Sequence, residues 1–346
     1  MNQTPMPLIR TGVDLKPLNT FGVPSSASLF CEVESAEQLY LLRDSNFFEE
    51  AMPFVLGGGS NVLLSEKLKI PVLKTGMKGI RIVASEMKSV RVEVQGGEEW
   101  HHLVKWAVER DFGGIENLAF IPGTVGAAPI QNIGAYGMEL KDCIELVEWI
   151  DFRDFRTHTF TPEECAFGYR DSIFKNELKG VGMVKAVILK LSRERHDLRY
   201  EYGALREYLG ESSCETPTLT SIFDAVVAIR RSKLPDPAEI GNAGSFFKNP
   251  VLPVSQFEEL QQAWNELPGY PDKPGYIKVP AGWLIEKAGW KGRRSGNAGT
   301  WSTQALVIVN YGDADAEEIL ALADSIRLDV LKQFGVALSP EVNLIY

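Results

Sequence analysis

The sequence predicts an α+β fold, because strand and helix patterns are mixed along all of its 346 residues. Segments such as "VRVEVQGG" (90–97) alternate as a strand does, whereas "EEWHHLVKWAVER" (98–110) carries its apolar residues at helical spacing. The character of the chain changes near residues 80 and 220. We therefore expect three parts, with bounds 1–80, 81–222 and 223–346.

The first two parts combine short strands with single helices. "SAEQLYLLRD" (35–44) predicts a helix that begins with a capping box of Ser35 and Gln38. "MPFVLGGGSNVLL" (52–64) is typical of a strand, a glycine turn and a second strand. Further strands are predicted near 144–151 and in "MVKAVILKLS" (183–192).

The last part begins with a helix in "TSIFDAVVAIRRSKLPDP" (220–237), which the prolines end. A second helix is expected from a capping box of Ser255 and Glu258, and "QALVIVN" (304–310) predicts a buried strand. The final helix is expected to run from a cap at Asp315 and Glu318 to Gly335.

Composition narrows the class of protein. The net charge of −10 argues against attraction to nucleic acid or anionic membranes, and no apolar run approaches the roughly 20 residues of a membrane-spanning helix. The four scattered cysteines have no metal-ligand spacing, so we expect buried, reduced thiols and no metal site. His101 and His102 are expected to lie on a helix without a catalytic role. We expect a cytoplasmic monomer.

Two glycine-rich segments suggest a nucleotide site. Gly57, Gly58 and Gly59 follow a strand, but Val62 stands where a Rossmann fingerprint has its third glycine, and a strand follows instead of a helix. The turn therefore forms either a nest of backbone N–H groups for phosphate or a tight hairpin. The second cluster, "IPGTVGAAPIQNIGAYG" (121–137), favours a dinucleotide held between the two segments. Motifs for nucleotide-triphosphate hydrolysis and for a serine-hydrolase elbow are absent from the sequence.

Motifs along nearly the whole chain carry a family resemblance. They are "LNTFGV", "GGGSNVLL", "ENLAFIPGTVGAAPIQNIGAYG", "FGYRDSIFK", "KLPDP", "GNAGSFFKNP", "AGWLIEKAG" and "PEVNLI". In these the chain resembles the UDP-N-acetylenolpyruvoylglucosamine reductase family. The resemblance implies a vanillyl-alcohol-oxidase-type, two-part FAD-binding domain and a C-terminal α+β substrate-binding domain. It also implies reduction of the enolpyruvyl UDP-sugar to UDP-N-acetylmuramate in peptidoglycan precursor synthesis, with non-covalent FAD and with NADPH as co-substrate.

The resemblance assigns roles to particular residues. Those for catalysis are Arg170, Ser245 and Glu341. Those for FAD are Gly57, Gly58, Gly59, Ser60, Asn61, Gly123, Thr124, Gly126, Ala127, Gly134, Tyr136 and Gly137. Those for the UDP-sugar are Tyr202, Arg230, Lys233, Asn249, Tyr270 and Gln304, where Tyr202 belongs to a tyrosine loop near 198–206 typical of one subgroup and Tyr200 is an alternative.

The chemistry explains why these residue types suit the reaction. Hydride addition to the terminal enolpyruvyl carbon leaves an enolate, which the guanidinium of Arg170 and a protonated Glu341 can stabilise. Ser245 then delivers the proton to the neighbouring carbon. Gly244 allows close approach of the backbone, and Phe246 and Phe247 exclude water.

Two other functions stay open at this point. An oxidase of the same flavin fold would return its electrons to oxygen. A flavin-free protein that binds nucleotide sugars would be colourless.

Overall fold

The computed structural model describes residues 4–211 and 216–346. The chain folds into two compact units, which are described separately. The larger unit comprises Met1–Val13, Ala27–Gly59 and Lys69–Ser232, and the smaller unit comprises Asp14–Ser26, Ser60–Leu68 and Lys233–Tyr346. The α+β class is confirmed, whereas the division at residues 80 and 222 stays a prediction because the two units are a coarser division.

A first sheet of the larger unit has the strand order β1-β2-β6-β3, with both β2 and β3 parallel to β6. Its apolar face packs against helix α1, which buries Leu39 and Leu42. The predicted cap of this helix is confirmed, since the Ser35 hydroxyl accepts a hydrogen bond from the Gln38 N–H at 3.2 Å. The elements are β1 (Arg10–Asp14), β2 (Ser26–Val33), α1 (Ala36–Leu42), β3 (Phe54–Leu56) and β6 (Val72–Thr75).

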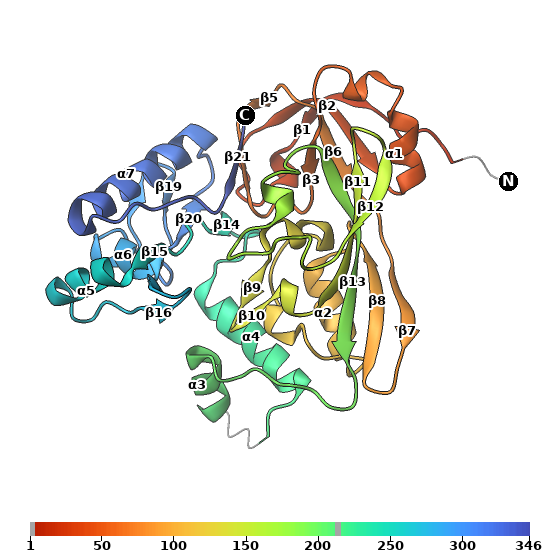
Figure 1. Cartoon of the computed structure of the whole chain (residues 1–346). Helices are drawn as coiled ribbons and strands as arrows, with labels where there is room; N and C mark the ends of the chain where they lie inside the picture. The colour runs from red at the N-terminus through yellow and green to blue at the C-terminus, as the bar shows by residue number, and fades with distance from the viewer. Residues whose placement is uncertain (1–3, 212–215) are drawn as a thin grey trace. The chain divides into compact units, whose positions relative to one another are not determined.

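A second, antiparallel sheet of the larger unit has the order β12-β11-β13-β8-β7, and its long strands lie side by side in Figure 1. Helices α2 and α4 contribute to the same core, which contains Trp100 and Trp149. The elements are β7 (Ile80–Ser85), β8 (Ser89–Gln95), α2 (Trp100–Val108), β11 (Ile144–Asp151), β12 (Arg156–Phe160), β13 (Gly182–Ser192), α3 (Gly203–Glu211) and α4 (Leu219–Lys233). The short strands β9 (Gly134–Ala135) and β10 (Met138–Glu139) form a hairpin.

The smaller unit contains a sheet of order β14-β20-β19-β18, a sheet of order β15-β17-β16 and the parallel pair β4 and β21. Helix α7 lies along β19 in Figure 1 and buries Ile319 and Ile326 in the core. The elements are β4 (Val62–Leu64), β5 (Lys67–Leu68), β14 (Gly241–Ser245), β15 (Val251–Pro253), α5 (Val254–Ala263), β16 (Tyr270–Pro271), β17 (Tyr276–Lys278), α6 (Ala281–Lys287), β18 (Arg294–Ser295), β19 (Ala298–Thr300), β20 (Val307–Asn310), α7 (Ala316–Phe334) and β21 (Asn343–Ile345).

Of the two helix caps predicted in the smaller unit, one is confirmed and the other is wrong. Asp315 caps α7 by accepting from the Glu318 N–H at 2.8 Å, and Gly335 ends the helix in a left-handed conformation. Helix α5, however, begins after Pro253 and has no side-chain cap, so the capping box at Ser255 is wrong. Proline fixes an extended conformation there and starts the helix earlier than the serine does.

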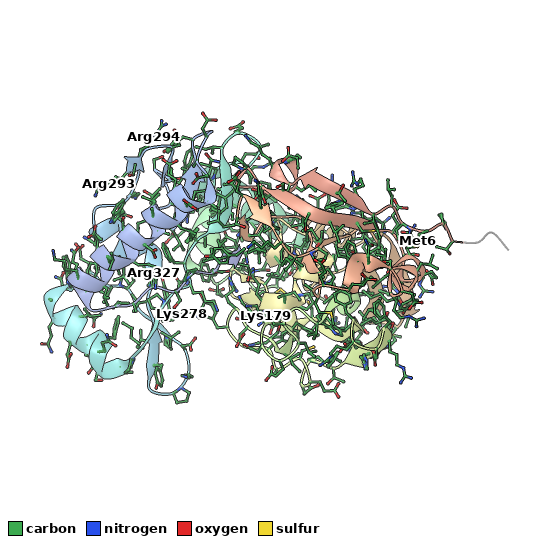
Figure 2. The ribbon with its side chains drawn as sticks, turned by 90° about the horizontal axis from the view of Figure 1, so that it is seen from above. Met6, Lys179, Lys278, Arg293, Arg294 and Arg327 are labelled. Atoms are coloured by element: carbon green, nitrogen blue, oxygen red, sulfur yellow. The ribbon has the colours of Figure 1, made fainter. Side chains whose placement is uncertain are left out.

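A side-chain hydrogen bond joins helix α7 to the segment that precedes the last strand. Arg327, labelled in Figure 2, donates from Nε to the Leu338 carbonyl at 3.2 Å. This contact holds the segment that leads to Glu341 and β21. Because β21 pairs in parallel with β4, the end of the chain adds to the strand that follows the first glycine turn.

The cysteines that the structure describes are buried thiols, as the sequence predicts. Cys31, Cys143 and Cys165 are buried free thiols, and Cys214 lies outside the described residues. Burial raises the pKa of Cys31 to about 11 and that of Cys165 to about 12, so both are unreactive thiols at neutral pH. Within 4–211 and 216–346, helices are too short or too polar to cross a bilayer, and groups of acidic, histidine and cysteine side chains that could hold a metal are absent.

Candidate active site

The two glycine turns meet in the larger unit. A Cβ at Gly58 would lie 2.8 Å from the Gly123 Cα, and a Cβ at Gly57 would lie 2.6 Å from the Thr124 Oγ1. Strand β3 pairs with β6 and β4 pairs with β21, so the first turn is not a hairpin. The buried Thr124 Oγ1 has no hydrogen-bond partner among the described residues, which leaves a polar atom available to a ligand at this junction.

A third turn, Gly134–Gly137, receives several side chains on its carbonyl oxygens. Arg170 donates from Nη2 to the Gly134 carbonyl at 2.7 Å. Asn117 donates to the Tyr136 carbonyl at 3.0 Å, and Arg199 donates to the Gly137 carbonyl at 3.4 Å. The turn therefore connects a predicted catalytic residue with two residues that the sequence did not single out.

The backbone of this turn and of its arginine is in an uncommon conformation. Tyr136 has a φ of 48° and Arg170 a φ of 54°, both in the left-handed region that non-glycine residues seldom adopt. Such conformations cost roughly 1–3 kcal/mol each and persist where surrounding contacts hold them. Here the Gly134 and Tyr136 carbonyl contacts supply that restraint.

Arg230, on α4, lies near the same turn. Desolvation lowers the pKa of Arg230, the charge of Arg170 lowers it further, and Tyr136 opposes the shift. Burial raises the pKa of Tyr136, so its hydroxyl is neutral at physiological pH. Arg230 donates from Nε to the carbonyl of Phe120 at 3.0 Å. Two guanidinium groups beside one turn favour an anionic ligand.

His101 has a supporting contact that the sequence did not reveal. Its Nδ1 accepts a hydrogen bond from the Phe120 N–H at 3.0 Å, and its ring stacks on Phe223 with centroids 5.5 Å apart. Burial is the main cause that lowers the pKa of His101, which keeps Nδ1 available as an acceptor. The histidine thus fixes the backbone of Phe120, which has a φ of 57° and whose carbonyl accepts the hydrogen bond from Arg230.

The tyrosines of the predicted loop have different surroundings. Tyr202 is exposed and its ring meets that of Tyr136 edge to face, with centroids 5.7 Å apart. Tyr200 instead packs against the hydrophobic core of the larger unit. The carbonyl of Tyr202 also accepts from the N–H groups of Leu205 and Arg206 at the start of α3.

Ser245 and Glu341 are brought together in the smaller unit. The Phe246 N–H donates to Leu306 and the Phe246 carbonyl accepts from the Glu341 N–H at 2.8 Å, so the strand that carries Ser245 runs beside Glu341. Gly244 has a φ of 67°, and the pairing of β14 with β20 is irregular between Asn242 and Ser245. This bulge changes the direction of the strand at the serine.

Phe246 and Phe247 are buried behind that strand. The centroids of their rings are 5.1 Å apart, and the ring of Phe246 also packs edge to face with that of Phe21, with centroids 6.3 Å apart. The aromatic pair fixes the backbone position of Ser245.

The remaining predicted site residues of the smaller unit are dispersed. Asn61 belongs to this unit and donates to the Glu341 carbonyl at 3.4 Å. Asn249 Oδ1 accepts from the N–H of Ala281 at 2.9 Å, at the start of α6. A Cβ at Gly282 would lie 2.9 Å from the Gln304 Oε1, so Gln304 lies against the same helix start. Ser60 precedes Asn61 in this unit. Lys233 is exposed, and its backbone carbonyl accepts a hydrogen bond from the hydroxyl of Thr303. Tyr270 is exposed on β16.

Known proteins match this chain over nearly its whole length. The FAD binding domain matches residues 48–159, and the C-terminal domain of UDP-N-acetylenolpyruvoylglucosamine reductase matches residues 236–345. The UDP-N-acetylenolpyruvoylglucosamine reductase of Flavobacterium johnsoniae is 45% identical over 337 residues, which are 97% of this chain and 99% of the relative. The chain belongs to the UDP-N-acetylenolpyruvoylglucosamine reductase family.

Two further comparisons agree with this membership. The reductase of Pseudomonas aeruginosa is 47% identical over 95% of this chain and 97% of its own length. The crystal structure of UDP-N-acetylenolpyruvylglucosamine reductase from Thermus caldophilus superposes with a TM-score of 0.70 at 27% identity, over 99% of this chain and 100% of that one. The predicted combination of an FAD-binding domain with a C-terminal domain of this family is confirmed.

As a member of the UDP-N-acetylenolpyruvoylglucosamine reductase family, the chain is a flavin-dependent UDP-N-acetylmuramate dehydrogenase of peptidoglycan precursor synthesis that uses FAD and NADPH. The glycine turns fit FAD, since side chains at Gly57 and Gly58 would collide with the second turn and the Thr124 Oγ1 is left for a ligand.

Sequence reasoning missed Asn117. This residue is fully buried and donates to two carbonyls, those of Tyr136 and Arg199. A signal for it was present in "ENLAFIPG", where an amide side chain stands in an apolar run directly before the second glycine cluster.

Proposed function

We propose that this dehydrogenase reduces the enolpyruvyl ether of its UDP-sugar with Ser245 as the proton donor. The observation that carries the proposal is the hydrogen bond from the Glu341 N–H to the Phe246 carbonyl at 2.8 Å, which brings the backbone of Glu341 beside the residue that follows Ser245. A hydroxyl and a carboxyl on neighbouring segments can act on adjacent atoms of one small group.

The residues for FAD are proposed from the three glycine turns. Gly57, Gly58, Gly59, Ser60 and Asn61, then Gly123, Thr124, Gly126 and Ala127, and then Gly134, Tyr136 and Gly137 would hold it. Reduced FAD, when bound, supplies the hydride that no side chain can supply. Backbone turns of this kind hold a pyrophosphate without a covalent link, so we propose that the cofactor is bound non-covalently.

Arg170 and Glu341 are proposed to stabilise the enolate. The contact of Arg170 Nη2 with the Gly134 carbonyl orients the guanidinium, and a guanidinium fork suits the two oxygens of a carboxylate. Glu341 is proposed to stabilise the enolate through its carboxyl group beside the same carboxylate oxygens.

Ser245 is proposed to protonate the carbon beside the carboxylate. A hydroxyl is a weak acid, but an enolate carbon is basic enough to take its proton when the geometry is fixed. The buried pair Phe246 and Phe247 supports this role, because it anchors the backbone on the side of the strand away from solvent.

The UDP-sugar is proposed to bind through charged and hydrogen-bonding side chains. Lys233 and Arg230 carry positive charge for the diphosphate, while Asn249, Tyr270 and Gln304 offer hydrogen bonds. We further propose that the chain belongs to the subgroup with a substrate-capping tyrosine loop. The exposed Tyr202 suits that role better than the partly buried Tyr200, which packs against the core.

We also propose that the enzyme is a cytoplasmic monomer that binds neither nucleic acid nor membrane. The net charge of −10 supports the lack of affinity for anionic polymers and surfaces.

The decisive experiment follows NADPH oxidation with and without the enolpyruvyl UDP-sugar, both in air and under anaerobic conditions. We expect fast oxidation only with the sugar. Oxidation that needs oxygen and ignores the sugar would instead indicate an oxidase of the same flavin fold, and a colourless protein would indicate a binding protein without flavin.

A further inference from the structure

The Gly134–Gly137 turn and the tyrosine segment, residues 196–206, are joined in the larger unit by one buried amide. Asn117 is 0% exposed. Its Nδ2 donates to the Tyr136 carbonyl at 3.0 Å and to the Arg199 carbonyl at 2.6 Å. A primary amide has two N–H donors, so both are used, one on each segment.

The orientation of this amide is fixed by what it faces. Both neighbouring groups are carbonyl oxygens, which accept only, so the Asn117 nitrogen must point at them. Its Oδ1 is buried and has no partner among the residues that the structure describes. A buried acceptor without a hydrogen bond costs free energy. The link that the Asn117 amide makes between the two segments explains why this cost is tolerated.

The same two segments meet at further points. The Arg199 guanidinium forms an ion pair with Asp142 and donates to the Gly137 carbonyl at 3.4 Å. The rings of Tyr136 and Tyr202 pack edge to face at 5.7 Å. Contacts therefore run from both the backbone and the side chains of the turn to the tyrosine segment.

We propose that Asn117 is a positioning residue that couples FAD at the Gly134–Gly137 turn to the order of the tyrosine segment. FAD held by the turn fixes the Tyr136 carbonyl, and the amide passes this restraint to Arg199, three residues before Tyr202. The segment proposed to cap the substrate is thus more ordered in the FAD-loaded enzyme than in the FAD-free one. The inference rests on the proposed placement of FAD at this turn.

His196 provides a matched control in the same segment. Its Nδ1 lies 2.7 Å from the Ser192 Oγ, and its Nε2 lies 3.2 Å from the Asp111 Oδ1. These contacts anchor the segment to strand β13 and to the turn after α2, and neither involves the Gly134–Gly137 turn. Loss of His196 should loosen the segment without affecting its response to FAD.

Hydrogen exchange followed by mass spectrometry tests the coupling. The peptide that covers residues 196–206 contains the N–H groups of Leu205 and Arg206, which both donate to the Tyr202 carbonyl. In the wild-type protein, FAD loading should slow exchange of this peptide roughly tenfold or more, the effect of stabilising two hydrogen bonds. In Asn117→Leu, which keeps the size of the side chain and removes both donors, FAD loading should change the exchange rate less than about twofold.

The variants separate coupling from stability. His196→Leu should exchange faster both with and without FAD but keep the wild-type ratio between the two states. A purely structural role of Asn117 would give the same pattern, and an unchanged FAD response in Asn117→Leu overturns the proposal. If that variant does not fold, Arg199→Ala separates the two contacts with the turn, because it removes the guanidinium that donates to the Gly137 carbonyl and keeps the backbone carbonyl that Asn117 binds. This variant should keep the FAD response; its loss would assign the coupling to the guanidinium and overturn the role of Asn117.

Failure of the coupling can be distinguished from failure of the FAD assignment. If FAD binds elsewhere, the wild-type peptide itself will not respond to FAD. If FAD binds at the turn and Asn117 does not couple it, wild type and Asn117→Leu will respond equally.

Discussion

The two units hold their predicted catalytic residues by opposite means. In the larger unit, side chains hold a bent backbone: Arg170 and Asn117 donate to the carbonyls of a turn that contains a left-handed Tyr136. In the smaller unit, backbone hydrogen bonds hold the side chains, because Ser245 ends strand β14, which pairs with β20, and the Glu341 N–H donates to the carbonyl of the next residue, Phe246. A single substitution in the larger unit can therefore move backbone, whereas one in the smaller unit should remove a functional group and leave the fold intact.

Ser245→Ala gives the largest effect that this comparison predicts. The strand should be unchanged, so flavin reduction by NADPH, followed anaerobically by rapid mixing, should proceed at nearly the normal rate. Reoxidation by the enolpyruvyl UDP-sugar should slow by about 10²- to 10⁴-fold, as is typical for loss of a general acid. Equal slowing of both half-reactions in a folded, FAD-loaded variant would show that the serine shapes the site instead of delivering the proton.

Lys233→Ala should remove one charge-assisted contact with the substrate phosphates. We expect kcat/KM for the UDP-sugar to fall roughly 10- to 150-fold, which corresponds to about 1.5–3 kcal/mol. FAD content should stay at the wild-type level. Lys291→Ala, which removes a surface cation paired with Glu286 at 2.9 Å, is the control for loss of charge alone. Loss of flavin from a folded Lys233→Ala protein would assign the lysine to the cofactor.

Gly58→Ala tests the larger unit, where backbone meets backbone. The added Cβ would lie 2.8 Å from the Gly123 Cα, so the two turns must separate at a cost of about 1–3 kcal/mol. FAD affinity, measured by titrating the apoprotein, should fall while the fold persists. Gly210→Ala is the matched control, since a Cβ there meets nothing within 4 Å. Undiminished FAD affinity in Gly58→Ala would place the cofactor away from the turns.

Asp315→Ala should have the smallest effect. Loss of the hydrogen bond to the Glu318 N–H should lower the free energy of unfolding by about 0.5–2 kcal/mol, measured by urea denaturation. Ser255→Ala should leave stability unchanged, because this serine does not cap α5. A comparable loss in Ser255→Ala would mean that α5 begins where the sequence pattern indicates.

The sequence by itself determined the α+β class, the segments that become β8, β11, β13, β20 and α7, and the family to which the chain belongs. These features are local or depend on long motifs in order: alternation defines β8, a cap and a left-handed glycine define α7, and "GNAGSFFKNP" is specific as a string. Periodicity and turn chemistry are read within a dozen residues, so a single chain is sufficient to find them.

Only the tertiary structure decided which distant residues meet. The glycine turn at 57–59 could have been a hairpin, and the pairing of β3 with β6 and of β4 with β21 shows that it is not. Asn117 stands in an apolar run, but this pattern does not show what the amide binds, because its two partners, the Tyr136 and Arg199 carbonyls, are 19 and 82 residues away in the chain. Backbone carbonyls look the same in every sequence, so a side chain that serves them can be identified only when the fold has brought them to it.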